Sequence, residues 1–118
     1  MKHRPTDIRL HRQARMLEMV YADGESHRLS CEFLRVYSPS AEVTGHGPGQ
    51  EVLQVGKEAV TITGIEPVGN YGIKLVFSDG HDTGIYDWEY LYRLGVDQAR
   101  LWQTYLERLE AAGHQRQG

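Results

Sequence analysis

The sequence contains a single cysteine, Cys31, among its 118 residues. One cysteine cannot form an internal disulfide, so the chain does not have the pattern of a small secreted domain held by bridges. The sequence also lacks any apolar run near the roughly 20 residues that cross a bilayer. Its first residues, Met1–Pro5, lead into further charges rather than an apolar core, so we expect no signal peptide. These absences predict a cytoplasmic protein that does not enter a membrane.

A strong charge of either sign is missing as well. The 16 acidic residues against 13 basic ones give a formal net charge of −3, and the pI is near 6.0. This balance does not favour binding to a nucleic-acid backbone, which needs an excess of basic groups. The hydrophobic fraction of 40% is ordinary for a globular protein. We therefore expect one domain over residues 1–118 and no nucleic-acid partner.

Motifs of several enzyme classes are absent. Gly56-Lys57 is followed by Glu58 rather than serine or threonine, so no phosphate-binding P-loop is present. Gly-x-Ser-x-Gly, His-Glu-x-x-His and Cys-x-x-Cys do not occur either. Cys31 falls at the start of a predicted helix, a position that can lower the pKa of a thiol, but as a lone cysteine it is predicted to be a packing residue. The sequence thus favours a non-enzymatic protein, and the rival is an enzyme with His81 as a general base in a pocket.

What the sequence does contain is a series of short alternating segments followed by helical ones. Strands are predicted at 7–10, 15–21, 27–30, 60–69, 71–78 and 82–86, with a short one at 52–55 inside an irregular loop over 40–56. Helices are predicted at 31–37, 88–94 and about 97–112, capped by Ser30, Asp87 and Asp97. This order predicts an α+β fold. Its sheet is mainly antiparallel and twisted, is built from strand-turn-strand-helix units, and is covered by the C-terminal helix.

One segment is echoed 56 residues later. Val20-Tyr21-Ala22-Asp23-Gly24 is matched by Val76-Phe77-Ser78-Asp79-Gly80, and both precede a strand and a short helix. Either one stable local unit occurs twice or the chain contains a true duplication. A duplication predicts that the two units superpose about a pseudo-twofold axis.

Two histidines are candidates for a site. His81 follows an Asp-Gly turn and lies between Asp79 and Asp82, and carboxylates beside an imidazole can fix its tautomer or join it at a metal. His46 lies in a glycine-rich loop where the backbone can approach a ligand. The alternatives are a histidine that stabilises its own turn and a mobile loop histidine. The other four histidines are predicted to be solvated.

A partner surface is predicted at two places. Gly45, Gly47 and Gly49 form a loop with little side-chain cover. Trp88, Tyr90 and Tyr92 crowd one short helix, which cannot bury all three on a single stripe. We expect a protein partner to contact the loop and part of this aromatic cluster.

The segment Ser78-Asp79-Gly80-His81-Asp82-Thr83-Gly84-Ile85-Tyr86, with Leu34-Arg35 and Gly69-Asn70-Tyr71, resembles the gamma-butyrobetaine hydroxylase-like N-terminal domain family. The resemblance covers about residues 5–95 and marks the chain as a short, stand-alone bacterial member. This family was long classed as a bacterial domain of unknown function, and in the eukaryotic hydroxylases it precedes a catalytic domain that is missing here.

The resemblance implies a small zinc module with three cysteines and one histidine. The histidine corresponds to His81, but the cysteine positions fall on Ser38, Ser40 and Val43. Valine cannot ligate zinc, and neutral serine is a poor ligand, so this site is not available as the family has it.

Other members resemble partners of Mrp-type iron–sulfur carrier ATPases. The resemblance therefore implies a non-enzymatic accessory domain in iron–sulfur or metalloenzyme maturation, with no cofactor of its own. The alternative is a small zinc- or iron-binding module that uses His81 and His46 with Asp79 and Asp82.

Overall fold

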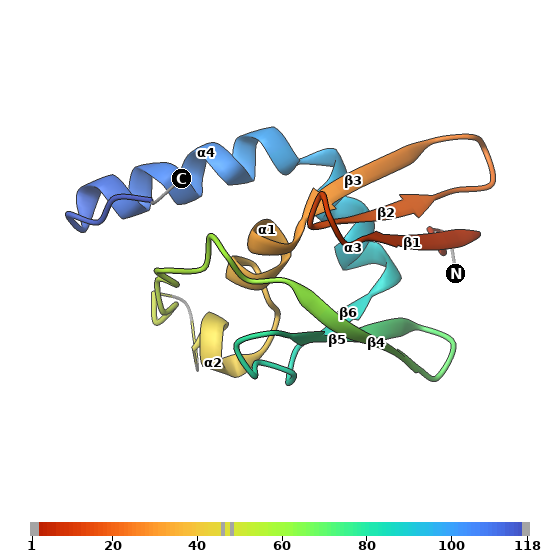
Figure 1. Cartoon of the computed structure of the whole chain (residues 1–118), viewed down its shortest axis with the longest axis horizontal. Helices are drawn as coiled ribbons and strands as arrows, with labels where there is room; N and C mark the ends of the chain where they lie inside the picture. Colours follow the sequence, from red (N-terminus) through yellow and green to blue (C-terminus); the bar gives the residue numbers. More distant parts are fainter. Residues whose placement is uncertain (1–2, 46, 48, 117–118) are drawn as a thin grey trace.

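The computed structural model describes residues 3–45, 47 and 49–116. It contains two three-stranded antiparallel sheets and four helices in the order βββααβββαα (Figure 1). The elements are β1 (Asp7–His11), β2 (Met16–Val20), β3 (Ser26–Ser30), α1 (Cys31–Val36), α2 (Ala41–Thr44), β4 (Ile62–Val68), β5 (Gly72–Phe77), β6 (Ile85–Asp87), α3 (Trp88–Val96) and α4 (Gln98–Ala111). The α+β class and the strand-turn-strand-helix units are confirmed, with the strands divided between two sheets.

The first sheet is a meander in the order β1-β2-β3, and α1 follows it directly. Leu17 and Met19 of β2 and Leu29 of β3 are completely buried, as the period of two predicts. The side chain of Ser30 accepts a hydrogen bond from the amide of Phe33 and so caps α1 as expected.

The second sheet repeats this arrangement with β4-β5-β6, followed by α3. Leu75 and Phe77 of β5 and Tyr86 of β6 are buried. Asp87 caps α3 by accepting from the amide of Tyr90. Gly95 does not end this helix, which continues to Val96, and Gly95 is not among the glycines with positive φ. A methyl group on Gly95 would lie 2.1 Å from the ring of His27, so only glycine fits there. That histidine was predicted to be solvated and is instead half-buried.

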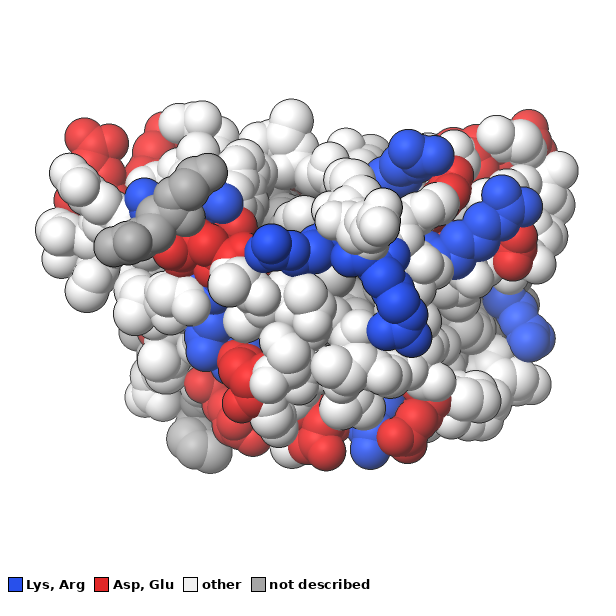
Figure 2. All heavy atoms as spheres, viewed as in Figure 1, with Lys and Arg blue, Asp and Glu red and all other residues white. Residues whose placement is uncertain are grey.

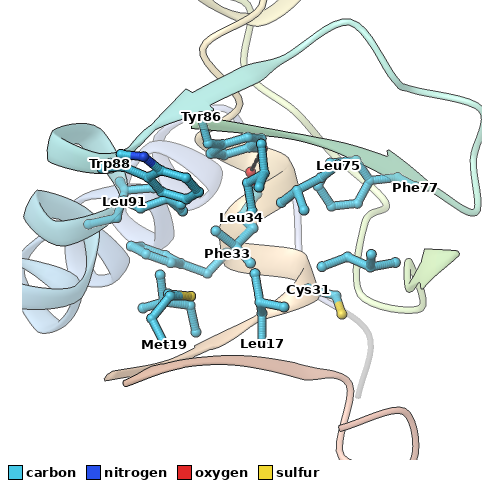
Figure 3. Close-up of a cluster of buried hydrophobic side chains, with 14 of the residues drawn as sticks. Leu17, Met19, Cys31, Phe33, Leu34, Leu75, Phe77, Tyr86, Trp88 and Leu91 are labelled. Carbon is cyan, nitrogen blue, oxygen red and sulfur yellow. Dashed lines mark hydrogen bonds between the residues drawn. The ribbon is translucent and has the colours of Figure 1, made fainter. Parts of the chain in front are cut away.

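The core lies between the two sheets, and α1 occupies its centre (Figure 3). Every residue of α1 is buried, including Glu32 and Arg35. Phe33 and Leu34 contact side chains from both sheets, and the hydroxyl of Tyr86 donates to the carbonyl of Leu34. The second meander is therefore tied to the helix that follows the first.

The helix α4 closes one side of the molecule (Figure 1). Its predicted cap is wrong: Asp97 is also the C-cap residue of α3, makes no side-chain capping hydrogen bond, and pairs with Arg100 at 3.1 Å instead. Tyr105 and Leu109 pack against Val36, and the chain then turns back so that Arg116 binds Glu32 through two hydrogen bonds of 2.8 and 2.6 Å. This bidentate pair balances the buried Glu32 carboxylate. Over the described part of the chain, no helix has the length and apolar character needed to cross a membrane.

The segment between the two meanders differs from its prediction. No strand forms at 52–55; instead α2 is followed by an extended stretch that carries Val52, 54% exposed. The amide of Val52 bonds to the carbonyl of Val43, and Tyr105 donates to the carbonyl of Gln54 at 2.6 Å. These hydrogen bonds hold residues 52–54 against α2 and α4, so this stretch does not pair with either sheet.

Figure 2 shows basic side chains gathered over the β1–β2 hairpin, with acidic ones around them. Within the hairpin, Arg9 and Asp7 form an ion pair of 2.6 Å, and the partly buried Glu18 accepts from His11 at 2.8 Å. The charges of this face are thus partly paired with one another.

Candidate functional site

The second Asp-Gly turn places the carboxylate of Asp79 between two basic side chains, Arg35 and Lys57. Its Oδ2 accepts from Arg35 Nε at 2.9 Å and from Lys57 Nζ at 2.8 Å, and its Oδ1 accepts from the amide of His81 at 3.2 Å. Burial would raise the pKa of Asp79, but these three hydrogen bonds and the Arg35 charge outweigh it and lower the pKa to about 2. Asp79 is therefore a fixed anion that holds Arg35, whose side chain is 8% exposed.

His81 lies beneath this turn, with its side chain only 2% exposed. Nε2 is 2.8 Å from the hydroxyl oxygen of Ser38, while Nδ1 is 3.4 Å from Glu42 Oε2, too far for a good hydrogen bond. Burial, and next the charge of Arg35, lower the pKa of His81 despite the opposing effects of Glu42 and Asp79. The imidazole is therefore neutral at pH 7.

The contacts of His81 continue into a ring of polar side chains. Glu42 Oε1 accepts from the hydroxyl of Thr83 at 2.9 Å, and that hydroxyl lies 2.7 Å from the one of Ser40. The amide of Ser40 donates back to Ser38 Oγ at 3.3 Å. We call these five residues, Ser38, Ser40, Glu42, His81 and Thr83, the polar ring.

The order of Ser38, His81 and Glu42 matches that of a hydrolytic triad. A triad serine, however, must reach a substrate carbonyl. Ser38 is 0% exposed, and a methyl group on Gly84 would lie only 2.3 Å from its oxygen. In this conformation no carbonyl can approach Ser38, so the arrangement supports structure rather than acyl transfer.

The polar ring lies where the resemblance implied a zinc site. Ser38 and His81 are in contact and Ser40 belongs to the same ring, while Val43 is buried beside it in α2. Two hydroxyls, a valine and one imidazole do not make the thiolate-rich set that a structural zinc ion needs. The residues present do not fit that metal.

Of the other predicted metal ligands, neither Asp79 nor Asp82 is a member of the polar ring. Asp79 is engaged by Arg35 and Lys57, Asp82 is exposed, and His46 lies outside the described residues. Among the residues that the structure describes, no three His, Cys, Asp or Glu side chains converge on a possible metal position. A site that includes His46 stays a prediction.

Next to the polar ring is a groove of about 220 Å³. Its walls come from the end of α1, from α2, from the stretch at 51–54 and from α3 and α4. The lining side chains are mostly apolar or aromatic: Val36, Tyr37, Val43, Val52, Leu53, Tyr90 and Tyr105. The exposed residues Glu51 and Arg108 also line it, and Arg108 forms no ion pair with any residue that the structure describes. We call this the α2–α4 groove.

Of the predicted partner residues, Tyr90 lines this groove. The loop with Gly45, Gly47 and Gly49 joins two groove walls, Thr44 and Glu51. Gly45 has φ +75, and a methyl group there would lie 2.1 Å from the carbonyl oxygen of Gln50. Only glycine fits that position.

The aromatic cluster exposes less surface than its sequence suggested. Trp88 is buried and donates to the carbonyl of Asn70 at 2.8 Å. Tyr90 is half-buried in the groove wall, while Tyr92 stacks on His3 with ring centroids 3.8 Å apart. One short helix can have all three aromatic rings covered because a different part of the chain packs against each of them. A contact of these residues with a partner stays a prediction.

Sequence reasoning missed Glu42, Thr83 and most of the groove. Glu42 and Thr83 are both exposed, so neither follows a hydrophobic pattern. The available signal was the clustering of hydroxyls around Ser38, which becomes informative only once the β5–β6 loop is placed next to it.

Comparison with known proteins agrees with this architecture. A solution NMR structure is 48% identical over 95% of this chain and 88% of that chain, with a TM-score of 0.82. A second one is 52% identical over 98% and 88%, with a TM-score of 0.81. A crystal structure of a protein of unknown function from Acidithiobacillus ferrooxidans, in the DUF971 family, is 43% identical over 77% and 91%, with a TM-score of 0.65. No protein in the curated set matches the chain.

The fold and the polar ring define a small α+β domain made of two meander–helix units. The family model for gamma-butyrobetaine hydroxylase-like N-terminal domains matches residues 8–92. The chain belongs to this family, as the Asp-Gly-His segment predicted.

Proposed function

We propose that this chain is a cytoplasmic, non-enzymatic accessory domain that binds a protein partner through the α2–α4 groove. The observation that carries the proposal is the groove itself, an apolar hollow next to the glycine loop at 45–49. At about 220 Å³ it is smaller than most small-molecule sites. It suits one or two apolar side chains of an extended partner segment.

The residues at the opening of the groove indicate which residue types the partner segment contains. Arg108 stands at the rim and can pair with an acidic group of the partner, while Val52 adds exposed apolar surface beside it. An apolar residue flanked by an acidic one satisfies both features. Most of the affinity would come from the buried apolar anchor.

The partner we propose is a Mrp-type iron–sulfur carrier ATPase, which places the chain in iron–sulfur or metalloenzyme maturation. The support for this choice is family membership together with the association that the family resemblance implies.

The test compares two valines of matched exposure. Val52 lies in the groove wall and is 54% exposed, whereas Val96 lies at the end of α3 and is 56% exposed. Val52→Asp should weaken binding to the purified ATPase at least about tenfold by calorimetry, and Val96→Asp should leave it unchanged. Equal losses in both variants, or no binding by the wild-type protein, would reject this partner or this surface.

The alternative function is a small zinc- or iron-binding module using His81, His46, Asp79 and Asp82. The observation that favours it is the buried Nδ1 of His81, which makes no hydrogen bond and lies 3.4 Å from a carboxylate oxygen. Elemental analysis of protein purified without a histidine tag tests it. About one equivalent of metal that is lost on His81→Asn would support the module.

A further inference from the structure

We infer that in this chain the polar ring replaces the family's metal site, fastening the α1–α2 connection to the β5–β6 loop by hydrogen bonds alone. The inference concerns the ring and does not depend on the proposed partner. It follows from how the ring is closed, from the charges beside it and from its packing.

The ring links two segments that are about 40 residues apart in the sequence. Ser38, Ser40 and Glu42 come from the α1–α2 connection and α2, while His81 and Thr83 come from the β5–β6 loop. Three contacts cross between them: Ser38 to His81 at 2.8 Å, Ser40 to Thr83 at 2.7 Å and Thr83 to Glu42 at 2.9 Å. This is the connection that a metal with ligands on both segments would make.

The three hydroxyl groups of the ring are satisfied by hydrogen bonds that run in one consistent direction. The Thr83 hydroxyl donates to Glu42, so the Ser40 hydroxyl donates to Thr83, and the Ser40 amide donates to Ser38. Ser38 then donates to Nε2 of His81, which places the imidazole proton on Nδ1, facing the Glu42 carboxylate. Every hydroxyl is both donor and acceptor. The one buried ring atom without a hydrogen bond, Nδ1 of His81, then carries a proton and has no lone pair to offer a cation.

The charges and packing around the ring also disfavour a dication. The buried guanidinium of Arg35 lies next to it and is held by Asp79, whose backbone neighbour His81 is a ring member. The only carboxylate in the ring, Glu42, is 63% exposed. On the inner side, Gly84 approaches Ser38 so closely that no extra atom fits. A zinc ion would meet one imidazole, little negative charge and a nearby positive group.

The experiment compares the wild-type protein with a triple variant, Ser38→Cys, Ser40→Cys and Val43→Cys. Both are purified without a tag, analysed for metal and melted with and without EDTA. The wild type should hold less than about a tenth of an equivalent of zinc, with an unchanged Tm. The triple variant should gain about one equivalent, lose Tm in EDTA and give a thiolate-to-metal absorption band with Co²⁺.

Two further variants test the role of the hydrogen bonds. Ser38→Ala leaves His81 without its buried partner and should lower Tm by about 5 °C or more, with or without zinc. Should it fail to fold, Thr83→Val at an exposed position removes two ring contacts and should lower Tm by a smaller amount. The matched control is Thr44→Val, an exposed threonine of α2 whose hydroxyl donates to the carbonyl of Ser40 at 3.1 Å and makes no bond to the β5–β6 loop, so it should have a smaller effect than Thr83→Val.

Stoichiometric zinc in the wild type would overturn the inference and support the metal-binding alternative. A folded triple variant without zinc would show that the ring does not occupy the metal position. Unchanged melting of Ser38→Ala and Thr83→Val would show that the ring does not fasten the two segments. None of these outcomes affects the binding test with Val52→Asp, so the two proposals fail independently.

Discussion

The two meander–helix units use the same backbone design for different purposes. In both Asp-Gly turns the glycine has φ +89 and donates its amide three residues back, from Gly24 to Tyr21 and from Gly80 to Phe77, each at 3.0 Å. The aspartate side chain accepts from the amide two residues on in both, at 2.9 Å in the first turn and 3.2 Å in the second. The sequence echo is therefore also an echo in structure.

The side chains around the two turns differ completely. Glu25 occupies in the first turn the place that His81 has in the second, and it pairs with His27 and Tyr92 at the edge of the first sheet. His81 is covered by the α1–α2 connection. What packs against a turn, rather than the turn itself, decides whether it becomes part of a site.

The largest expected loss of stability is at Gly72, the position in the second unit that corresponds to Met16 in the first. Each is the first residue of its central strand and faces the last residue of the third strand, Asp87 or Ser30. A methyl group on Gly72 would lie 2.5 Å from the carbonyl oxygen of Tyr86. Gly72→Ala should therefore cost about 3 kcal/mol or prevent folding, as seen in chemical denaturation. The control Gly64→Ala makes only ordinary contacts and should change stability by less than about 0.5 kcal/mol.

The two turn aspartates should differ next most strongly. Asp79→Asn keeps the turn hydrogen bond but removes the charge that holds Arg35 and Lys57, and should cost about 2 kcal/mol at pH 7. Asp23→Asn removes an exposed charge and should cost less than about 0.5 kcal/mol. Equal effects would contradict the distinction between the turns.

The same aspartate predicts a pH dependence of unfolding. The pKa of Asp79 in the folded protein is about 2, below its ordinary value of 3.8. Its contribution is therefore complete above about pH 4 and is lost as the pH falls towards 2. Denaturation at several pH values should show this loss in the wild type and in Asp23→Asn but not in Asp79→Asn.

Replacing either turn glycine, Gly24 or Gly80, by alanine should lower stability by a similar amount. Gly24 and Gly80 share φ +89, and a methyl group on either would enter open space. Each Gly→Ala change should cost about 1–2 kcal/mol from backbone strain alone. Melting both variants without metal measures the two losses of stability. A much larger loss at Gly80 would mean that strain in this turn also disturbs the polar ring.

The smallest expected effects concern the helix caps. Ser30 and Asp87 cap α1 and α3 through equivalent hydrogen bonds to the third helical amide. Ser30→Ala and Asp87→Ala should each cost about 1 kcal/mol. The Asp87 loss should shrink in high salt, because its charge also interacts with the helix dipole, whereas the Ser30 loss should not.

Much of the secondary structure could be predicted because it rests on local chemistry. Ser30 and Asp87 cap helices through neighbours three residues away, and the Asp-Gly turns close within five residues. The stretch at 52–55 was mispredicted because Val52 and Gln54 are fastened by α2 and α4, which no local pattern records. Gly95 was likewise misread as the end of its helix, whereas its place is set by the close approach of His27, a residue far away in sequence.

The sequence by itself determined the two meander–helix units, their turns, the helix caps at Ser30 and Asp87, and the family to which the chain belongs, since all of these depend on residues close together along the chain. Only the tertiary structure decided that Ser38 meets His81, that Glu42 and Thr83 close a ring, and that a groove opens beside it. Those features join segments about 40 residues apart. Their energies depend on burial and on directional hydrogen bonds, which exist only after the two units have packed around α1.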